Sequence, residues 1–491
     1  MKAKSANLAL PPSHLSDSPA TLREKILAIL RADPFINGVL VMAVTIGFFH
    51  GWLKIRFPHP VTTFLFDAFL GLALALTFLK LKRREPFIPK GAIGDSLKAF
   101  YVVCVIYAFL PFGPPLLVSI AALRGWCFPT LMFCLGYHLT KSLQQVRGYF
   151  YVLILLGVIT AAYGLQQTPE EIEKQKEHDE NFAERYKFTY YDKGGGERQF
   201  RNFSTFVSAG VFGNVMAYVS VFAIVLISDP KTSKRERLLL IPATGLMCYA
   251  IMLSGARTSF ISLGLGLIVI AWYRRNFQNF VIIPAAIYVA LKIAASVTAG
   301  AASDRFSSLL KIGEVVERVF IPTYLGWNFM MDHLFGGGLG KSGYSVPFVF
   351  VQKLNYTDRY WVDGDLGCLM IEMGIIGLLF FGRLIWAAVK TAYTSLDRLR
   401  DTPVSTVALA SAACLVLALG HFPIGAPFLS IPMGAMVWFF LGTLQKLSDE
   451  HQEQPLTQTE TTTATATPAK NYLYYRPKQT DKASSQRNPR S

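Results

Sequence analysis

The sequence predicts an all-α, polytopic integral membrane protein with about twelve transmembrane helices and one long helical external loop. Of its 491 residues, 52% are hydrophobic, and the mean hydropathy is +0.36. Only 16% are charged, whereas soluble domains average roughly 25%. Apolar runs of about 16–25 residues recur along most of the chain, which is the length that a helix needs to cross a bilayer.

The chain starts with a polar tail, residues 1–35, which contains the stretch "TLREKILAIL". Thr21 and Glu24 have the spacing of a capping box, which predicts a helix start. The apolar residues that follow share one helical face: Leu22, Ile26, Ile29 and Leu30. We predict a short amphipathic helix on the membrane surface. Three basic residues are expected to face anionic headgroups: Arg23, Lys25 and Arg31.

The predicted transmembrane domain covers residues 36–445. Its first apolar run, near Ile36, is expected to be a retained anchor rather than a cleavable signal peptide. Hydropathy places the spans at approximately 36–53, 61–80, 97–112, 116–138, 149–166, 205–228, 237–253, 258–273, 278–297, 364–389, 404–420 and 426–444. Residues 446–491 are of low complexity and are expected to form a disordered cytoplasmic tail.

The distribution of the basic residues predicts the orientation. Alternate gaps between spans are rich in Lys and Arg, as in "KLKRREPFIPK", "DPKTSKRER" and "YRRN". The opposite gaps, such as "FPHP" and "HFPIGAP", carry almost no charge. The positive-inside rule therefore puts both termini in the cytoplasm. It also accounts for the net charge of +16 without nucleic acid as a partner, since no recognition module is visible. Two long segments, 167–204 and 298–363, are then external.

Several arginines fall on the external side, where orientation signals do not require them. Arg257 lies in "LSGARTSF" and Arg201 in "RNFSTFVSAGVFGN", while Arg305 and Arg318 lie in the second long segment and Arg124 enters the fourth span. Arginine at membrane depth is costly and is usually paired or functional. A set of guanidinium groups would bind phosphate well. The alternative is that each pairs with a nearby carboxylate or a lipid headgroup.

Acidic and imidazole side chains supply candidates for proton transfer. Asp363 and Asp365 stand at the external mouth of the tenth span, and Glu372 lies about two turns deeper. These aspartates could deprotonate a hydroxyl group or simply cap the helix. His333, in "WNFMMDHLFGGGLGKSGY", is a candidate base or an interfacial polar residue, and His421 is a further external candidate. The glycines there could approach a ligand closely but do not match a P-loop. No metal-type cysteine spacing occurs, so no metal or cofactor is expected.

Four blocks occur in a characteristic order between about residues 100 and 445: "RNFSTFVSAGVFGN", "LSGARTSF", "RVFIPTYLGWNFMMDHLFGGGLG" and "DGDLGCLMIEMGIIGLLFF". Together they resemble the O-antigen ligase and O-antigen polymerase superfamily. The resemblance implies a GT-C-like membrane glycosyltransferase, metal-independent and inverting, in the bacterial inner membrane with its active site facing the periplasm. It implies an undecaprenyl-diphosphate-linked glycan as donor, and another lipid-linked repeat or lipid A-core as acceptor.

The resemblance also assigns roles to residues. It makes Arg201, Arg257 and Arg318 the best candidates for holding the diphosphate, with Arg305 next. Ligases of this superfamily usually carry a histidine just before the span with the G-I-I-G element, where this chain reads "VDGDLG". That departure favours a polymerase for O-antigen, capsule or exopolysaccharide, with Asp363 or Asp365 as the base on the acceptor side.

The implied partners are lipid-linked glycans, membrane lipids, and flippase and chain-length regulator proteins. Three other functions stay open. The first is an O-antigen ligase, and the second is a transporter or anion permease, which twelve spans would also suit. The third is a non-catalytic partner in glycan assembly. Transporters often contain inverted repeats and broken midplane helices, but the sequence has no clear repeat and its charges gather near the external face.

Overall fold

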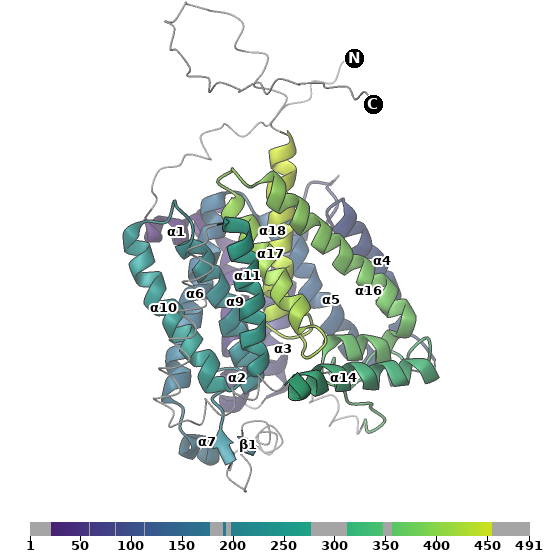
Figure 1. The fold of residues 1–491 in the computed structure, drawn as a ribbon. Helices are drawn as coiled ribbons and strands as arrows, with labels where there is room; N and C mark the ends of the chain where they lie inside the picture. Colours follow the sequence, from purple (N-terminus) through teal and green to yellow (C-terminus); the bar gives the residue numbers. More distant parts are fainter. Residues whose placement is uncertain are drawn as a thin grey trace, which may run out of the picture. The chain divides into compact units, whose positions relative to one another are not determined.

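The computed structural model describes residues 21–176, apart from positions 58, 84 and 112, together with 190–192, 198–275, 312–346 and 356–453. The chain divides into two units, Met1–Ser448 and Asp449–Ser491. All features below belong to the first unit (Figure 1), apart from the last residues of the final helix.

Long helices make up most of the described chain. In order they are α1 (Leu22–Ala32), α2 (Pro34–Arg56), α3 (Pro60–Lys80), α4 (Ala92–Ala108), α5 (Leu116–Leu139), α6 (Leu143–Gln166), α9 (Ala209–Ile227), α10 (Lys234–Ser254), α11 (Arg257–Arg274), α14 (Ile312–Asp332), α16 (Asp365–Arg398), α17 (Ser405–His421) and α18 (Met433–Glu453). Seven of the described helices are long and apolar enough to cross a membrane: α2, α3, α5, α6, α9, α10 and α16. The predicted class, a helical polytopic membrane protein, is confirmed.

Eleven of the twelve predicted segments overlap a described helix, and the other, 278–297, lies outside the described residues. The twelfth, 426–444, was placed too early, because α18 covers Met433–Glu453, so 446–453 belong to this helix rather than to the predicted disordered tail. The third was placed too late in the chain, because α4 covers Ala92–Ala108 rather than 97–112. Gly91 is the N-cap of α4, and the proline-rich stretch "LPFGPP" follows the end of this helix. Helix α16 is longer than expected and continues to Arg398.

The first predicted external segment, 167–204, is only partly helical. It contains the short helix α7 (Pro169–Lys176) and an antiparallel pair of strands, β1 (Tyr190–Asp192) and β2 (Arg198–Phe200), which is the one departure from the all-α prediction in the described chain. Figure 1 shows α7, β1 and α14 at the end of the helix bundle opposite to α1. We call the end that holds α7, β1 and α14 the outer end, and the end that holds α1 the inner end. The described elements α7, β1 and α14, from the two segments predicted to be external, thus share the outer end.

The predicted start of α1 is confirmed. Thr21 and Glu24 form the capping box, with the Glu24 carboxylate accepting the Thr21 N–H at 2.7 Å and the Thr21 hydroxyl accepting the Glu24 N–H at 3.3 Å. The helix packs against α6, where a side chain at position 148 would collide with Ile29.

The expectation that Lys25 faces lipid headgroups is wrong. Lys25 is 6% exposed, and its ammonium group forms an ion pair of 2.6 Å with the carboxylate of Glu236 on α10. It lies one helical turn from the buried Ile29, so it shares the face of α1 that packs on α6. Arg23 and Arg31 are exposed.

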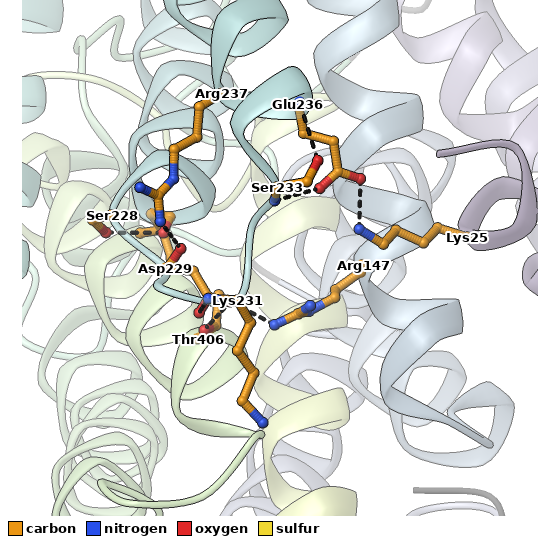
Figure 2. A network of polar contacts seen from close by, with 10 residues as sticks. Lys25, Arg147, Ser228, Asp229, Lys231, Ser233, Glu236, Arg237 and Thr406 are labelled. Atoms are coloured by element: carbon orange, nitrogen blue, oxygen red, sulfur yellow. Dashed lines mark hydrogen bonds and ion pairs between the residues drawn. The ribbon is translucent and has the colours of Figure 1, made fainter. Parts of the chain in front are cut away.

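A second buried ion pair lies nearby at the inner end (Figure 2). The Asp229 carboxylate accepts hydrogen bonds from Arg147 on α6 and from the Thr406 hydroxyl on α17, and its backbone oxygen accepts one from Arg237. Buried charges are tolerated only when they are paired and hydrogen-bonded. The basic loop "DPKTSKRER", interpreted from sequence as an orientation signal, therefore also joins α6, α10 and α17.

Candidate functional site

The turn between α10 and α11 lies at the outer end and contains "LSGARTSF". Gly255 ends α10 with a left-handed backbone, φ 57°, and its N–H donates to the Met252 oxygen at 2.9 Å. Glycine adopts this conformation without a Cβ clash, as is usual after a helix C-terminus. Helix α11 then begins at Arg257.

Arg201 is brought to this same turn. Its Nε donates a hydrogen bond of 2.9 Å to the Ser254 backbone oxygen, and the neighbouring N–H of Asn202 donates to the Leu253 oxygen at 3.2 Å. Arg201 and Arg257 are both half-buried. The N-cap of α11, Ala256, offers no side-chain hydrogen bond. The positive end of the α11 dipole therefore adds to the two guanidinium groups, which makes the turn suited to an anion.

Below the turn, a chain of hydrogen bonds joins three helices. The Ser259 hydroxyl donates to the Asn214 side-chain oxygen at 2.7 Å, and the Asn214 amide nitrogen lies 3.2 Å from His421 Nε2. All three residues are at most 4% exposed. The serine bonds to the amide and not to the imidazole, so this is not a nucleophile–base pair. It ties α9, α11 and α17 together and so supports the arginine turn.

The two candidate aspartates have different surroundings. Asp365 is fully buried, and its carboxylate accepts the Phe428 N–H at 2.7 Å from the turn between α17 and α18. The N-cap of α16 is Gly364, so Asp365 holds this neighbouring turn rather than capping its own helix. Asp363 is exposed.

Tyr344 interacts electrostatically with both aspartates. Burial raises the pKa of its phenol, and the nearby carboxylates of Asp365 and Asp363 raise it further. The phenol is therefore neutral at physiological pH and keeps a proton that it can donate.

Glu372 anchors the glycine-rich segment. Its carboxylate accepts hydrogen bonds from Trp126 Nε1 on α5, at 2.8 Å, and from the hydroxyls of Ser342 and Ser345. The group is completely buried, and three donors compensate the cost of removing it from water.

The backbone of the same segment fills a break in α16. This helix is interrupted at Gly374, where φ is 54°. The N–H groups of Gly337 and Gly338 donate to the oxygens of Ile371 and Glu372 at 2.8 and 3.0 Å, and the Ile375 N–H donates to the Leu334 oxygen at 3.0 Å. The glycines therefore allow close approach to α16 itself.

A cavity of about 270 Å³ opens at the outer end between α2, α3, α5 and α9. Asp67 on α3 and Arg124 on α5 form an ion pair of 2.6 Å on its wall. The other polar lining residues come from five segments: His50, Lys54, Thr63, Ser208, Tyr344, Ser345 and Ser430. Because Ser345 also bonds to Glu372, this outer cavity is continuous with the anchored glycine-rich segment.

Sequence reasoning identified Arg124 but missed Asp67, Lys54 and His50. The available signal was Asp67, an acid within the apolar run "TTFLFDAFLGLALALTF". An ionisable residue inside a span is a candidate functional residue by default. One alternative considered from the sequence was that each arginine pairs with a nearby carboxylate. Arg124 does so, with Asp67.

The remaining predicted residues lie elsewhere or outside the described chain. His333 is exposed at the end of α14, with its ring 4.7 Å from that of Phe329, and it does not line the outer cavity. Arg318 lies on α14, which packs against α16. Arg305 falls outside the described residues. Within the described ranges, no group of three or more His, Cys, Asp or Glu could hold a metal ion.

No family model matches this sequence, and no curated protein matches it. The fold and the site define a class: a polytopic helical membrane protein with an arginine-bearing turn and a polar cavity at the outer end of its bundle.

Proposed function

We propose that this protein is a GT-C-like membrane glycosyltransferase with about twelve spans that polymerises undecaprenyl-diphosphate-linked oligosaccharide repeats. It would act at the periplasmic face of a bacterial inner membrane, without a metal ion, in the synthesis of O-antigen, capsule or exopolysaccharide. The observation that carries the proposal is that Arg201 and Arg257 meet at one turn of the outer end. Arg201 is held there by the hydrogen bond of 2.9 Å from its Nε to the Ser254 backbone oxygen. The order of the four sequence blocks, two of which contain these arginines, also supports the proposal.

The reaction assigns a role to this turn. An acceptor hydroxyl oxygen attacks the anomeric carbon of the donor, the bond from that carbon to the diphosphate oxygen breaks, and the lipid diphosphate leaves with the electron pair. Arg201 and Arg257, with the α11 N-terminus, would neutralise the charge that develops on the leaving group. Arg318 and Arg305 are further candidates for this role.

The acceptor proton needs a base. Asp365 already accepts the Phe428 N–H and is fully buried. Exposed Asp363 is therefore the aspartate that an acceptor could reach, and geometry is the first requirement for a general base. His333, at the end of α14, is the second candidate.

The test is a reaction of the purified full-length protein in proteoliposomes with synthetic lipid-linked repeats, read as a ladder of polymer lengths. Arg257→Ala should lower the rate about 100-fold or more, as loss of one charge-stabilising group commonly does. Arg383→Ala is the matched control, because Arg383 is exposed on α16, a helix that does not form the turn. Normal polymer from Arg257→Ala would refute the proposal.

Further experiments distinguish the proposed polymerase from the other candidate functions. Transfer to lipid A-core alone would identify a ligase. Restoration of polymer in a deletion strain by the triple variant Arg201→Ala, Arg257→Ala and Arg318→Ala would identify a non-catalytic partner.

Among the described residues, the break in α16 at Gly374 is a feature that favours a transporter. However, the backbone N–H groups of Gly337 and Gly338 occupy the carbonyl oxygens beside the break, so the chain itself fills the place that a solute would take. Uptake of labelled phosphate into proteoliposomes that lack lipid-linked sugar would support the transporter instead.

A further inference from the structure

A second polar cavity, of about 510 Å³, lies at the inner end. It is lined by the start of α2 and by the ends of α3 and α5, together with residues from 85–90 and Lys446 of α18. The outer cavity uses the end of α2, the start of α3 and the middle of α5. The two cavities therefore lie toward opposite ends of α2 and α3, and the inner cavity is separate from the site proposed for catalysis.

The charge of the inner cavity is positive. Four lysines line it: Lys80, Lys90, Lys141 and Lys446. The acids that line it are Asp33 and Glu85, and His138 adds an imidazole. Asp33 is already paired with Lys80 at 2.7 Å. The lining thus carries four lysines against two carboxylates, a surplus of two positive charges, which makes the cavity suited to an anion.

Packing holds the wall of the cavity in place. The Gln445 side chain of α18 donates to the Lys90 backbone oxygen at 2.9 Å, and His138 Nε2 lies 2.8 Å from the Phe87 oxygen. These bonds fix the 87–90 segment against α5 and α18. The Lys446 ammonium group lies 5.4 Å from the centre of the Tyr137 ring, a cation–π distance that favours its present position.

Exposed apolar side chains flank the lining residues of this basic cavity along α2 and α3. Phe78 and Leu79 lie on α3 between Thr77 and Lys80, which both line the cavity, and they are 62% and 77% exposed. Phe35, next to the lining residue Ile36, is 63% exposed. On membrane-spanning helices such residues face acyl chains. A ligand with an anionic head and apolar tails would match both surfaces at once.

We propose that the inner cavity binds the phosphate of an anionic phospholipid, with its acyl chains lying along α2 and α3. Lysine clusters between membrane helices on the cytoplasmic side suit such headgroups, and the predicted orientation places this cavity on that side. A soluble phosphate ester would share the headgroup chemistry but would not use Phe35, Phe78 and Leu79. The proposal does not depend on the proposed glycosyl transfer.

The test measures lipid binding to the full-length protein in a neutral detergent. Dioleoylphosphatidylglycerol and dioleoylphosphatidylcholine are titrated separately, and the bound lipid is counted by native mass spectrometry. Wild-type protein should prefer the anionic lipid. The double variant Lys141→Gln and Lys446→Gln should bind it about 25-fold more weakly, since each lysine near a membrane surface contributes about fivefold. Lys390→Gln is the control, because Lys390 is exposed on α16 and does not line the cavity.

Several results would overturn the proposal. These are equal binding of the two lipids by wild type, unchanged binding by the double variant, or an equal loss in Lys390→Gln. Tail-less glycerol phosphate and inorganic phosphate form the third arm, and binding of either as tight as that of the lipid would exclude the phospholipid in favour of a soluble phosphate. If the double variant is not monodisperse, the exposed Lys90→Gln alone replaces it, with an expected loss of about fivefold.

Discussion

The carboxylate of Asp67 and the guanidinium group of Arg124 form an ion pair of 2.6 Å across α3 and α5, on the wall of the outer cavity. The two side chains are 9% and 20% exposed. Each would be costly alone within an apolar bundle, and each compensates the other. The pair therefore determines how α3 and α5 can approach each other at the outer end.

Asp67→Asn should destabilise the protein by about 3 kcal/mol, because it leaves the partly buried Arg124 without its anion. A double variant, Asp67→Asn with Arg124→Gln, should recover much of this loss, since it removes both charges. Thermal unfolding in detergent compares the stabilities of the wild type, the single variant and the double variant. Equal melting temperatures for wild type and the single variant would show that the pair contributes nothing.

Arg201→Ala should lower the proposed polymer synthesis about 100-fold, because it removes a charge-stabilising group and the bond to Ser254. Arg201→Lys should recover only part of the rate, since an ammonium group cannot bind phosphate in a bidentate manner. Initial rates with lipid-linked repeats measure both variants. A lysine variant as fast as wild type would mean that charge alone matters at this position.

Glu372→Gln should destabilise the protein by about 2 kcal/mol, because a charged acceptor of three hydrogen bonds becomes a neutral amide. Hydrogen exchange in 336–346 should increase as the serine contacts weaken. Asp358→Asn is the control, since Asp358 is paired with Lys341 but its side chain is 84% exposed. That change should stay within about 0.5 kcal/mol, and equal effects of the two would contradict the anchoring role.

Gly336→Ala should cost at least about 2 kcal/mol, since φ is positive there and an L-residue strains in that region. A Cβ at this position would also lie 2.7 Å from the Glu372 backbone oxygen. In Gly382→Ala the added Cβ meets nothing within 4 Å, and this helical position should gain about 0.5–1 kcal/mol. Opposite shifts in melting temperature are expected, and a tolerated Gly336→Ala would refute the close contact.

Lys25→Ala should destabilise the inner end by about 3 kcal/mol, because it leaves the carboxylate of Glu236 buried without its cation. Arg23→Ala is the matched control from the same helix, since Arg23 is exposed and should change stability by less than about 0.5 kcal/mol. Thermal unfolding compares them. If Arg23→Ala costs as much as Lys25→Ala, then α1 depends on its surface charge instead of its buried pair.

Local patterns in the sequence were sufficient to predict most of the helices. Long apolar runs predicted eleven helices that the structure describes, and the Thr21–Glu24 spacing predicted the start of α1. These features depend on residues within a few turns of one another, so periodicity reveals them. The misplaced start of α4 has a local cause too, because glycine and proline outweighed hydropathy there.

The residues that pair with buried charged side chains were not predictable from local patterns. Sequence alone predicted which segments are long and apolar enough to cross a bilayer, and it predicted that Arg201 and Arg257 belong to one end of the bundle. Only the tertiary structure decided that Lys25 pairs with a carboxylate 211 residues away and that Glu372 receives an indole N–H from 246 residues away. The physical reason is that a buried charge is stable beside any suitable partner, and helix packing, which a single sequence does not display, selects the partner.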